Sequence, residues 1–199
     1  MAGTGNIQKT VDLLNKGGVI AFSTDTVNGM AALYDNEDAI NSIFRMKKRC
    51  KDKPFALFFS SKESVLKYFH NSKLLKMVID EFLPGPLTVI SKPKRRVNKL
   101  LLKDGFASFR IPEKKDVLLL LELLKKPLAV TSLNVSGERV LTSEYGVEKV
   151  FDSISIFNKL KPSKTPSTIV KIKNGKIEIL REGAISKAVF FERINKHLK

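Results

Sequence analysis

Short apolar runs alternate with amphipathic patterns along the first two thirds of this 199-residue chain. Runs of four or five apolar residues have the length of buried strands, whereas apolar residues that recur every three or four positions are typical of helices with one buried face. The expected strands are 19–22, 55–59, 87–91, 107–111 and 127–131. This alternation predicts an α/β domain in which helices flank a twisted sheet.

The last third of the chain carries a different pattern. Two apolar runs, 169–172 and 177–180, flank Asn174-Gly175, and this combination predicts a β-hairpin. A hairpin beside strand–helix units makes the predicted sheet mixed. Helices are expected at 7–14, 39–46, 61–81 (one or two helices), 113–124, 144–151 and 187–197, and a further short strand at 153–156. No internal repeat or linker is evident, so we predict a single domain over residues 1–199.

The charge balance points to anionic partners without specifying them. Lys and Arg number 36 against 20 Asp and Glu, which gives a net charge of +16. Such an excess attracts nucleotides, phosphates or RNA. Lysines scattered over the surface account for part of it, and the sign of the charge alone does not separate a nucleic-acid binder from a nucleotide enzyme. The basic segment 92–103 lies between two expected strands and is predicted to be a mobile loop.

The cysteine and histidine content excludes two kinds of site. Cys50 is the sole cysteine, so no intrachain disulfide can form, and with only two histidines no convincing zinc cluster is available. We therefore expect no metal site built by the protein. The longest apolar runs, such as Val117–Leu121, are too short to span a bilayer, and residues 1–10 lack an apolar leader. These features predict a cytoplasmic protein without membrane association.

Polar residues cluster where expected strands or helices end. Residues 23–29 place hydroxyls and a carboxylate after the first strand, where they can face a ligand crevice, although a capped turn is the structural alternative. Lys47 and Arg49, followed by Lys53, could converge on one anion if the backbone turns between them. Cations favoured by a helix C-terminus, or a solvated basic face, are the alternatives there.

Two further clusters lie in the second half of the chain. Ser132 and Asn134 follow a strand, and in an extended segment their side chains point to the same side and could share a ligand. A turn rich in Asn, Ser and Gly is the alternative explanation. Hydroxyl residues at 165–168 precede one hairpin strand and Arg181 ends the other, so these groups could meet across the hairpin.

The joint order of these motifs is more specific than any one of them. They are Thr-Asp-Thr, Lys-x-Arg then Lys-Pro, Leu-Pro-Gly-Pro-Leu-Thr, Phe-Arg-Ile-Pro, Ser-x-Asn-x-Ser-Gly, Pro-Ser-Thr-Ile-Val and Arg-Glu-Gly-Ala. In this order they resemble the YrdC/TsaC family of threonylcarbamoyl-AMP synthases over about residues 7–185. The resemblance implies a YrdC-like α/β domain whose mixed twisted sheet and flanking helices surround a basic groove.

The resemblance also implies an activity. A member of this family is an L-threonylcarbamoyladenylate synthase, a nucleotidyltransferase that forms threonylcarbamoyl-AMP and pyrophosphate from L-threonine, bicarbonate and ATP, with Mg²⁺ accompanying ATP. A TsaD-type transferase complex then delivers the threonylcarbamoyl group to adenosine 37 of tRNA, which the synthase would meet directly or indirectly. The alternative implied by the same fold is a YciO-like RNA-binding protein without synthase activity.

Residue roles carried over by motif fall into three groups. The residues expected at the reacting centre are Lys47, Arg49, Ser132 and Asn134. Substrate binding is expected from Thr26, Lys53 and Arg110, and nucleotide binding from Ser136, Ser167 and Arg181.

Three departures from the family pattern concern the same region. Asn28 stands where a Tyr is common, and Lys48 stands where a Gly is common. No His lies near Phe58 or Phe59, where many members have one that contacts threonine. We therefore expect a threonine pocket of altered shape beside a stiffer and more basic loop.

Overall fold

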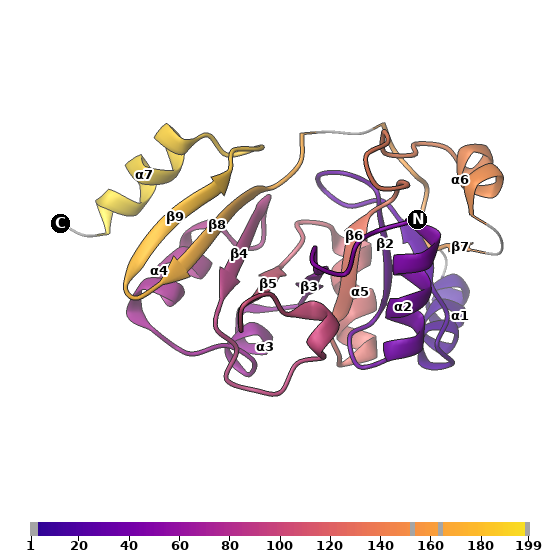
Figure 1. Cartoon of the computed structure of the whole chain (residues 1–199), viewed down its shortest axis with the longest axis horizontal. Coiled ribbons are helices and arrows are strands. Elements are labelled where there is room, and N and C mark those ends of the chain that lie inside the picture. Colours follow the sequence, from indigo (N-terminus) through magenta and orange to yellow (C-terminus); the bar gives the residue numbers. More distant parts are fainter. Residues whose placement is uncertain (1–3, 152–153, 163–164, 198–199) are drawn as a thin grey trace.

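The computed structural model describes residues 4–151, 154–162 and 165–197, and it is built on one nine-stranded sheet (Figure 1). The strand order is β7-β1-β2-β6-β3-β5-β4-β8-β9. The strands are β1 (Ile20–Phe22), β2 (Gly29–Leu33), β3 (Ala56–Phe58), β4 (Leu87–Ser91), β5 (Ala107–Arg110), β6 (Leu128–Ser132), β7 (Ser155–Ile156), β8 (Thr168–Lys173) and β9 (Lys176–Arg181). The helices are α1 (Thr4–Asn15), α2 (Glu37–Met46), α3 (Lys62–Leu66), α4 (Lys73–Phe82), α5 (Lys115–Leu124), α6 (Glu144–Val150) and α7 (Lys187–Lys196), with a short 3₁₀ helix η1 (Lys99–Leu101).

The sheet is mixed, as the sequence predicts. β2 runs antiparallel to β1 and β6, whereas β3 runs parallel to β5 and β4 parallel to β8. The predicted hairpin is confirmed as β8–β9, and Asn174 and Gly175 at its turn both have positive φ, 51° and 72°. Two such residues in succession match the twist of the flanking strands. The hairpin and α7 form one end of the molecule, and α1, α6 and β7 lie toward the other (Figure 1).

β2 is a strand that the sequence analysis did not predict. Its residues are Gly-Met-Ala-Ala-Leu, and the small ones have little strand preference of their own. All five are buried, so the strand shows no alternation of apolar and polar residues that could reveal it. Gly29 permits a close approach to β6, because a Cβ there would lie 3.2 Å from the carbonyl oxygen of Thr131. Tertiary burial therefore makes this segment a strand.

The two faces of the sheet are covered differently. On one face Leu57, Val89 and Phe109 belong to the main core, together with apolar residues of α2, α4 and α7. On the other face a second core, which includes Leu14 and Leu120, packs α1 and α5 against β1, β2 and β6. The part of this second face over β5, β4 and β8 forms the floor of a cavity. The ordinary in–out alternation of strand residues therefore separates the core from the candidate site.

Side-chain caps mark the starts of three helices that pack on the main-core face of the sheet. The side chain of Asn36 caps α2 by accepting a hydrogen bond from the amide of Ala39 at 2.9 Å. Ser61 and Ser72 cap α3 and α4 in the same way. The expected helical segment 61–81 is therefore two helices separated by a short connection.

The segment 92–103, expected to be a mobile loop, is anchored by its apolar residues. Val97 and Leu101 are buried, and the backbone amide of Lys94 donates to the carbonyl of Tyr68 at 2.8 Å. Its cations are exposed: Lys92, Lys94, Arg95, Arg96, Lys99 and Lys103. The segment is thus a packed connection with a basic outer surface.

Two remaining expectations concern short or absent elements. The strand expected at 153–156 is Ser155–Ile156 in the structure, and residue 153 lies outside the described residues. In the part of the chain that the structure describes, no helix combines the length and apolar character needed to cross a bilayer.

Candidate active site

A cavity of about 570 Å³ opens on the face of the sheet opposite the main core. Alternate strand residues form its floor: Ala56 and Phe58 of β3, Ser108 and Arg110 of β5, Thr88 and Ile90 of β4, and Ile169 and Lys171 of β8. The basic residues that line it are Arg49, Lys103, Arg110, Lys171 and Arg181, whereas Asp104 is the one acidic residue among its described lining. This balance favours negatively charged ligands.

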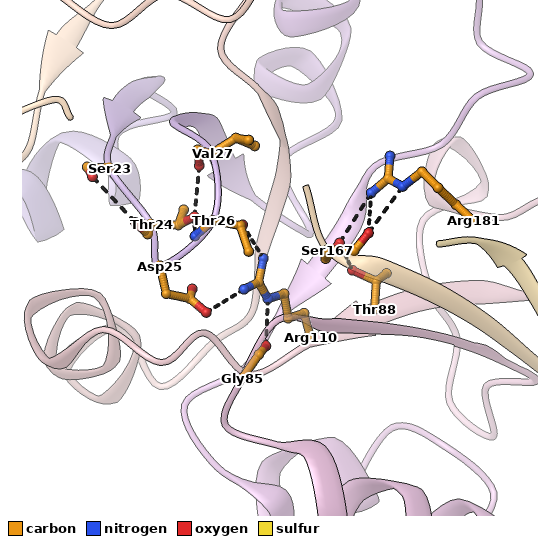
Figure 2. Close-up of polar contacts among 10 residues, drawn as sticks. All are labelled: Ser23, Thr24, Asp25, Thr26, Val27, Gly85, Thr88, Arg110, Ser167 and Arg181. Atoms are coloured by element: carbon orange, nitrogen blue, oxygen red, sulfur yellow. Dashed lines mark hydrogen bonds and ion pairs between the residues drawn. The ribbon is translucent and has the colours of Figure 1, made fainter. Parts of the chain in front are cut away.

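Arg110 of β5 lies in the floor and is almost completely buried; Figure 2 shows its polar contacts. Its guanidinium donates to the carbonyl of Gly85 at 3.0 Å, to Thr26 Oγ1 at 2.6 Å and to Asp25 Oδ2 at 2.5 Å. Burial lowers the pKa of Arg110, and the charge of Asp25 opposes that shift. Three of five N–H donors are used, which leaves one on each terminal nitrogen for a ligand.

The turn that carries Thr26 is held from within and from outside. Thr24 Oγ1 accepts from the amide of Thr26 at 3.0 Å and donates to the carbonyl of Val27 at 2.8 Å. The side chain of Asn158 accepts from the amide of Ser23 at 2.6 Å. These bonds satisfy the backbone of a tight turn at the end of β1 and aim the Thr26 hydroxyl at Arg110.

Arg181 ends β9 and lines the cavity, and it contacts Ser167, the residue that precedes the opposite hairpin strand (Figure 2). Its charge contributes to the lowering of the Arg110 pKa. Its Nε and Nη2 both donate to the carbonyl of Ser167, at 3.1 and 2.8 Å. The hydroxyl of Ser167 lies 2.8 Å from that of Thr88 on β4. The prediction that Arg181 meets the hydroxyl residues across the hairpin is confirmed. Burial lowers the pKa of Arg181.

Arg49 reaches the cavity because the chain reverses after α2. Lys48 adopts a left-handed conformation with φ 48°, so Lys47 and Arg49 leave the helix end in different directions. A glycine adopts this conformation without strain, which accounts physically for a preference for Gly at this position. Arg49 Nε donates to the carbonyl of Lys53 at 2.8 Å, and its guanidinium lies 5.6 Å from the centre of the Phe55 ring.

Lys47 and Asn134 belong to a cluster beside the cavity rather than to its lining. The Lys47 ammonium donates to the carbonyl oxygens of Ser132 and Asn134 and to Asn134 Oδ1. Ser132 Oγ also donates to Asn134 Oδ1, at 2.6 Å. Ser132 itself lines the cavity. The predicted Lys-x-Arg and Ser-x-Asn motifs are therefore brought together, but Lys47 and Arg49 do not converge on one point.

The predicted residues thus divide into two groups. Those that line the cavity are Thr26, Arg49, Arg110, Ser132, Ser167 and Arg181. Those outside its described lining are Lys47, Lys53, Asn134 and Ser136. Lys53 and Ser136 are exposed. The carbonyl of Lys53 accepts a hydrogen bond from Arg49 Nε, and the amide of Ser136 donates one to the carbonyl of Lys47.

Several residues of the site were given no individual role from the sequence. Asp25 and Thr24 lie inside the Ser23–Gly29 segment, and Thr88 lies inside the Leu-Pro-Gly-Pro-Leu-Thr motif, so a local signal existed for each. Asn158 carries no local signal, because its role depends on a contact with a residue 135 positions away.

Asn28 replaces the expected Tyr with an amide that joins three segments. Its Nδ2 donates to the carbonyls of Leu141 and Lys161, at 2.9 and 2.8 Å, and its Oδ1 accepts from the amide of Lys161 at 3.3 Å. It is buried and also lines the cavity. This residue therefore closes the cavity wall by tying the turn after β1 to two later segments.

Known proteins are similar to this chain in sequence and in fold. The profile of the Sua5/YciO/YrdC family, whose description reads "Telomere recombination", matches residues 12–183. A protein of Methanocaldococcus jannaschii that carries the provisional name threonylcarbamoyl-AMP synthase is 36% identical, in an alignment of 186 residues that covers 89% of this chain and 87% of that protein.

Solved structures agree with these matches. The crystal structure of P. abyssi Sua5 complexed with L-threonine has a TM-score of 0.86 and 26% identity, and the match covers 94% of this chain but 57% of Sua5. This chain therefore spans little more than half the length of that relative. E. coli YciO has a TM-score of 0.83 at 22% identity, with 93% of this chain and 92% of YciO covered, and shows the shared fold. With a family profile over most of its length and a relative 36% identical over most of both chains, the protein belongs to the Sua5/YciO/YrdC family.

Proposed function

We propose that this protein is an L-threonylcarbamoyladenylate synthase, which makes threonylcarbamoyl-AMP from L-threonine, bicarbonate and ATP. The observation that carries the proposal is one cavity into which Arg49, Arg110 and Arg181 all project from different parts of the chain. The provisional name of the M. jannaschii relative and the threonine bound to the Sua5 relative support it.

The reaction needs such a cavity because its reactants are anionic. The amine of threonine combines with bicarbonate or CO₂ to give a carbamate. A carbamate oxygen then attacks the α-phosphorus of ATP, the bond to the β-phosphate oxygen breaks, and pyrophosphate leaves. Fixed cations bring the reactants together and offset the charge that develops on the phosphate oxygens. This scheme requires no covalent nucleophile from the protein.

We assign the binding of the threonine carboxylate to Arg110 and Thr26. The two unused N–H groups of Arg110 can donate to a carboxylate, and arginine forms such paired contacts well. The Thr26 hydroxyl, already 2.6 Å from the guanidinium, is held beside the same position. Asp25 fixes the guanidinium, so little reorganisation is needed when substrate binds.

We assign nucleotide binding to Arg181, Ser167 and Thr88. Arg181 uses one edge of its guanidinium on the carbonyl of Ser167, which orients the group at the cavity wall. Arg49 is placed to offset charge on the transferring phosphate, with Ser132 on the same wall. Lys53 and Ser136 would act on the substrates only if their turns closed over the cavity.

Mg²⁺ fits this site as part of the MgATP substrate. The described residues contain no group of three or more His, Cys, Asp and Glu side chains that could hold a metal ion, and the cavity lining offers the carboxylate of Asp104. Mg²⁺ commonly takes its oxygens from substrate phosphates and water rather than from an all-protein cage. With MgATP bound, the arginines of the cavity would donate hydrogen bonds to phosphate oxygens.

The product is a reactive mixed anhydride, so we propose that a TsaD-type transferase complex in the cytoplasm uses it on tRNA.

The test of the function itself is direct. The purified protein is incubated with ATP, threonine and bicarbonate, and threonylcarbamoyl-AMP is sought by mass spectrometry, with omission of each substrate and Arg49→Ala as controls. We expect adenylate only in the complete mixture. A folded protein that retained RNA and made no adenylate would favour the YciO-like alternative.

A further inference from the structure

Lys47 is the one lysine among the described residues that is completely buried, and its charge meets no carboxylate. Its ammonium contacts three oxygens of one short turn: the carbonyl of Ser132, the carbonyl of Asn134 at 2.6 Å and Asn134 Oδ1 at 2.9 Å. A lysine ammonium has three N–H donors, so these three acceptors use all of them. A ligand in the cavity would have to displace one of these contacts to bind Lys47 directly.

The turn held by Lys47 is part of the cavity wall. The backbone amide of Ser136 donates to the carbonyl of Lys47 at 2.9 Å, so the two segments are joined through both backbone and side chain. Asn134 Nδ2 donates to the carbonyl of Glu138 at 2.7 Å, and Ser132 Oγ donates to Asn134 Oδ1. The position of the Ser132 hydroxyl therefore depends on the Asn134 amide, and that amide depends on Lys47.

Arg49 links this buried cluster to the cavity. Burial, and then the charge of Arg49, lower the pKa of Lys47 to about 7, so the ammonium and the neutral amine coexist near neutral pH. The amine has two N–H donors and leaves one of the three turn oxygens unpaired. An anion bound beside Arg49 weakens the repulsion between the two cations and favours the ammonium.

We propose that Lys47 is a positioning residue that couples anion binding at Arg49 to the ordering of the turn 132–138. When a nucleotide phosphate lies beside Arg49, Lys47 gains a proton and makes all three contacts with the turn, and Ser132 is fixed at the cavity wall. The identity of the anion rests on the proposed function, whereas the coupling itself concerns any anion at Arg49.

The charged groups around Lys47 come from three elements. Arg45 lies in the last turn of α2. Lys48, Arg49 and Asp52 lie in the following turn, where Asp52 acts on Arg49. Glu138 and Arg139 lie in the turn after β6, but both are exposed, and Glu138 meets the cluster through its backbone carbonyl. Arg49 is the ionisable neighbour whose charge acts on Lys47.

The first measurement is proton uptake on nucleotide binding. ATP is titrated into the protein at pH 7 without threonine or bicarbonate, in two buffers that differ in ionisation enthalpy. Lys47→Met is the matched control, because it keeps the side-chain length and cancels protons exchanged by ATP itself. We expect the wild type to take up roughly half a proton per ATP more than the variant, since a group with a pKa near 7 is half protonated there. Equal uptake by the two proteins overturns the proposal.

The second measurement follows the turn by amide hydrogen exchange, corrected for the intrinsic effect of pH. In the wild type we expect ATP to slow exchange in residues 133–138 at pH 8, where the amine predominates in the free protein, and to change it little at pH 6. Lys47→Met should exchange rapidly there with and without ATP. The same ATP protection in both proteins would mean that Lys47 does not position the turn.

A third readout separates positioning from direct binding. Lys47→Met should lower kcat more than tenfold while the KM for ATP changes less than threefold, whereas loss of a direct phosphate ligand raises that KM.

If Lys47→Met does not fold, the wild-type exchange experiment decides: ATP protection that is the same at pH 6 and pH 8 contradicts the coupling. Proton uptake and exchange need no turnover, so coupling without adenylate formation would refute the proposed function alone.

Discussion

Arg110 and Arg181 line the same cavity, but they differ in whether a carboxylate of the protein pairs with the charge. Arg110 is 3% exposed and forms an ion pair with Asp25 at 2.5 Å. Arg181 is held by the carbonyl and hydroxyl of Ser167, and within the described ranges no carboxylate lies at ion-pair distance from it. One arginine is compensated by the protein, and the other keeps an uncompensated charge at the cavity wall.

This difference distinguishes cations that stabilise the folded protein from cations whose charge is available to a ligand. A buried charge needs a partner in the folded protein, so Arg110 must be paired before any substrate arrives. Arg49 resembles Arg181 in that its guanidinium bonds to a carbonyl, that of Lys53, although the nearby charge of Asp52 offsets part of its own. We therefore expect anions to add most binding energy at Arg49 and Arg181, whereas Arg110 adds orientation and stability.

The largest expected effect is on stability at Arg110. Arg110→Met should lower the free energy of unfolding by about 3–5 kcal/mol, because the Asp25 carboxylate, whose side chain is 12% exposed, is left charged without its partner. Urea denaturation at pH 7 measures this. Arg181→Met is the matched control, and we expect it to cost about 1 kcal/mol, the typical contribution of the hydrogen bonds lost. An equal loss of unfolding free energy in the two variants would contradict the difference between the two arginines. The double variant Asp25→Asn with Arg110→Met should recover part of the stability lost in Arg110→Met.

The next largest effect is on turnover at Arg49. Arg49→Ala should reduce adenylate formation on the order of 10²–10³-fold, the usual cost of losing one preorganised charge contact. Its melting temperature should stay within a few degrees of the wild type, because the side chain is only partly buried and pairs with a backbone carbonyl. Wild-type pyrophosphate release by soluble Arg49→Ala would show that this cation does not serve the reaction.

A smaller effect is expected when Arg181 keeps its charge but loses its shape. Arg181→Lys cannot donate from two nitrogens to the carbonyl of Ser167 and still present a planar edge to the cavity. Loss of one charge-assisted hydrogen bond, about 1.4 kcal/mol, corresponds to a roughly tenfold higher KM for ATP. The KM for threonine should not change. Initial rates at varied ATP and at varied threonine separate the two, and a shift in the threonine KM would contradict the assignment of Arg181 to the nucleotide.

The sequence predicts most of the elements because their signals are local. The hairpin at Asn174-Gly175 and the alternating strands each follow from a few adjacent residues. β2 was missed because burial from both sides, rather than its own residues, makes it a strand. The site divides in the same way: Arg110 and Arg181 lie within recognisable motifs, whereas the support that Asn158 gives to the turn at Ser23 depends on distant chain positions.

The geometry of the Lys-x-Arg motif could not be read from spacing. Because Lys47 and Arg49 are two residues apart, the sequence suggested that they could bind one anion together. The left-handed conformation at Lys48 instead directs Lys47 into the protein and Arg49 into the cavity. The burial of Lys47 depends on the turn after β6, some 85 positions later in the chain. Spacing alone carries no information about that contact.

The smallest expected effect on turnover comes from cations outside the cavity. Lys94, Arg95 and Arg96 are exposed, none belongs to the cavity lining, and the segment is anchored by buried Val97. Changing all three cations to Ala should leave adenylate formation within about twofold, because salt screens exposed charges that do not line the cavity. The same variant should lose tRNA retention that in the wild type falls steeply with salt, since released counterions govern such binding. Filter binding and turnover are measured together at two salt concentrations. If turnover fell with RNA retention, Lys94, Arg95 or Arg96 would contribute to the active site, and the distinction between cations that face the ligand and cations of the outer surface would be wrong for this segment.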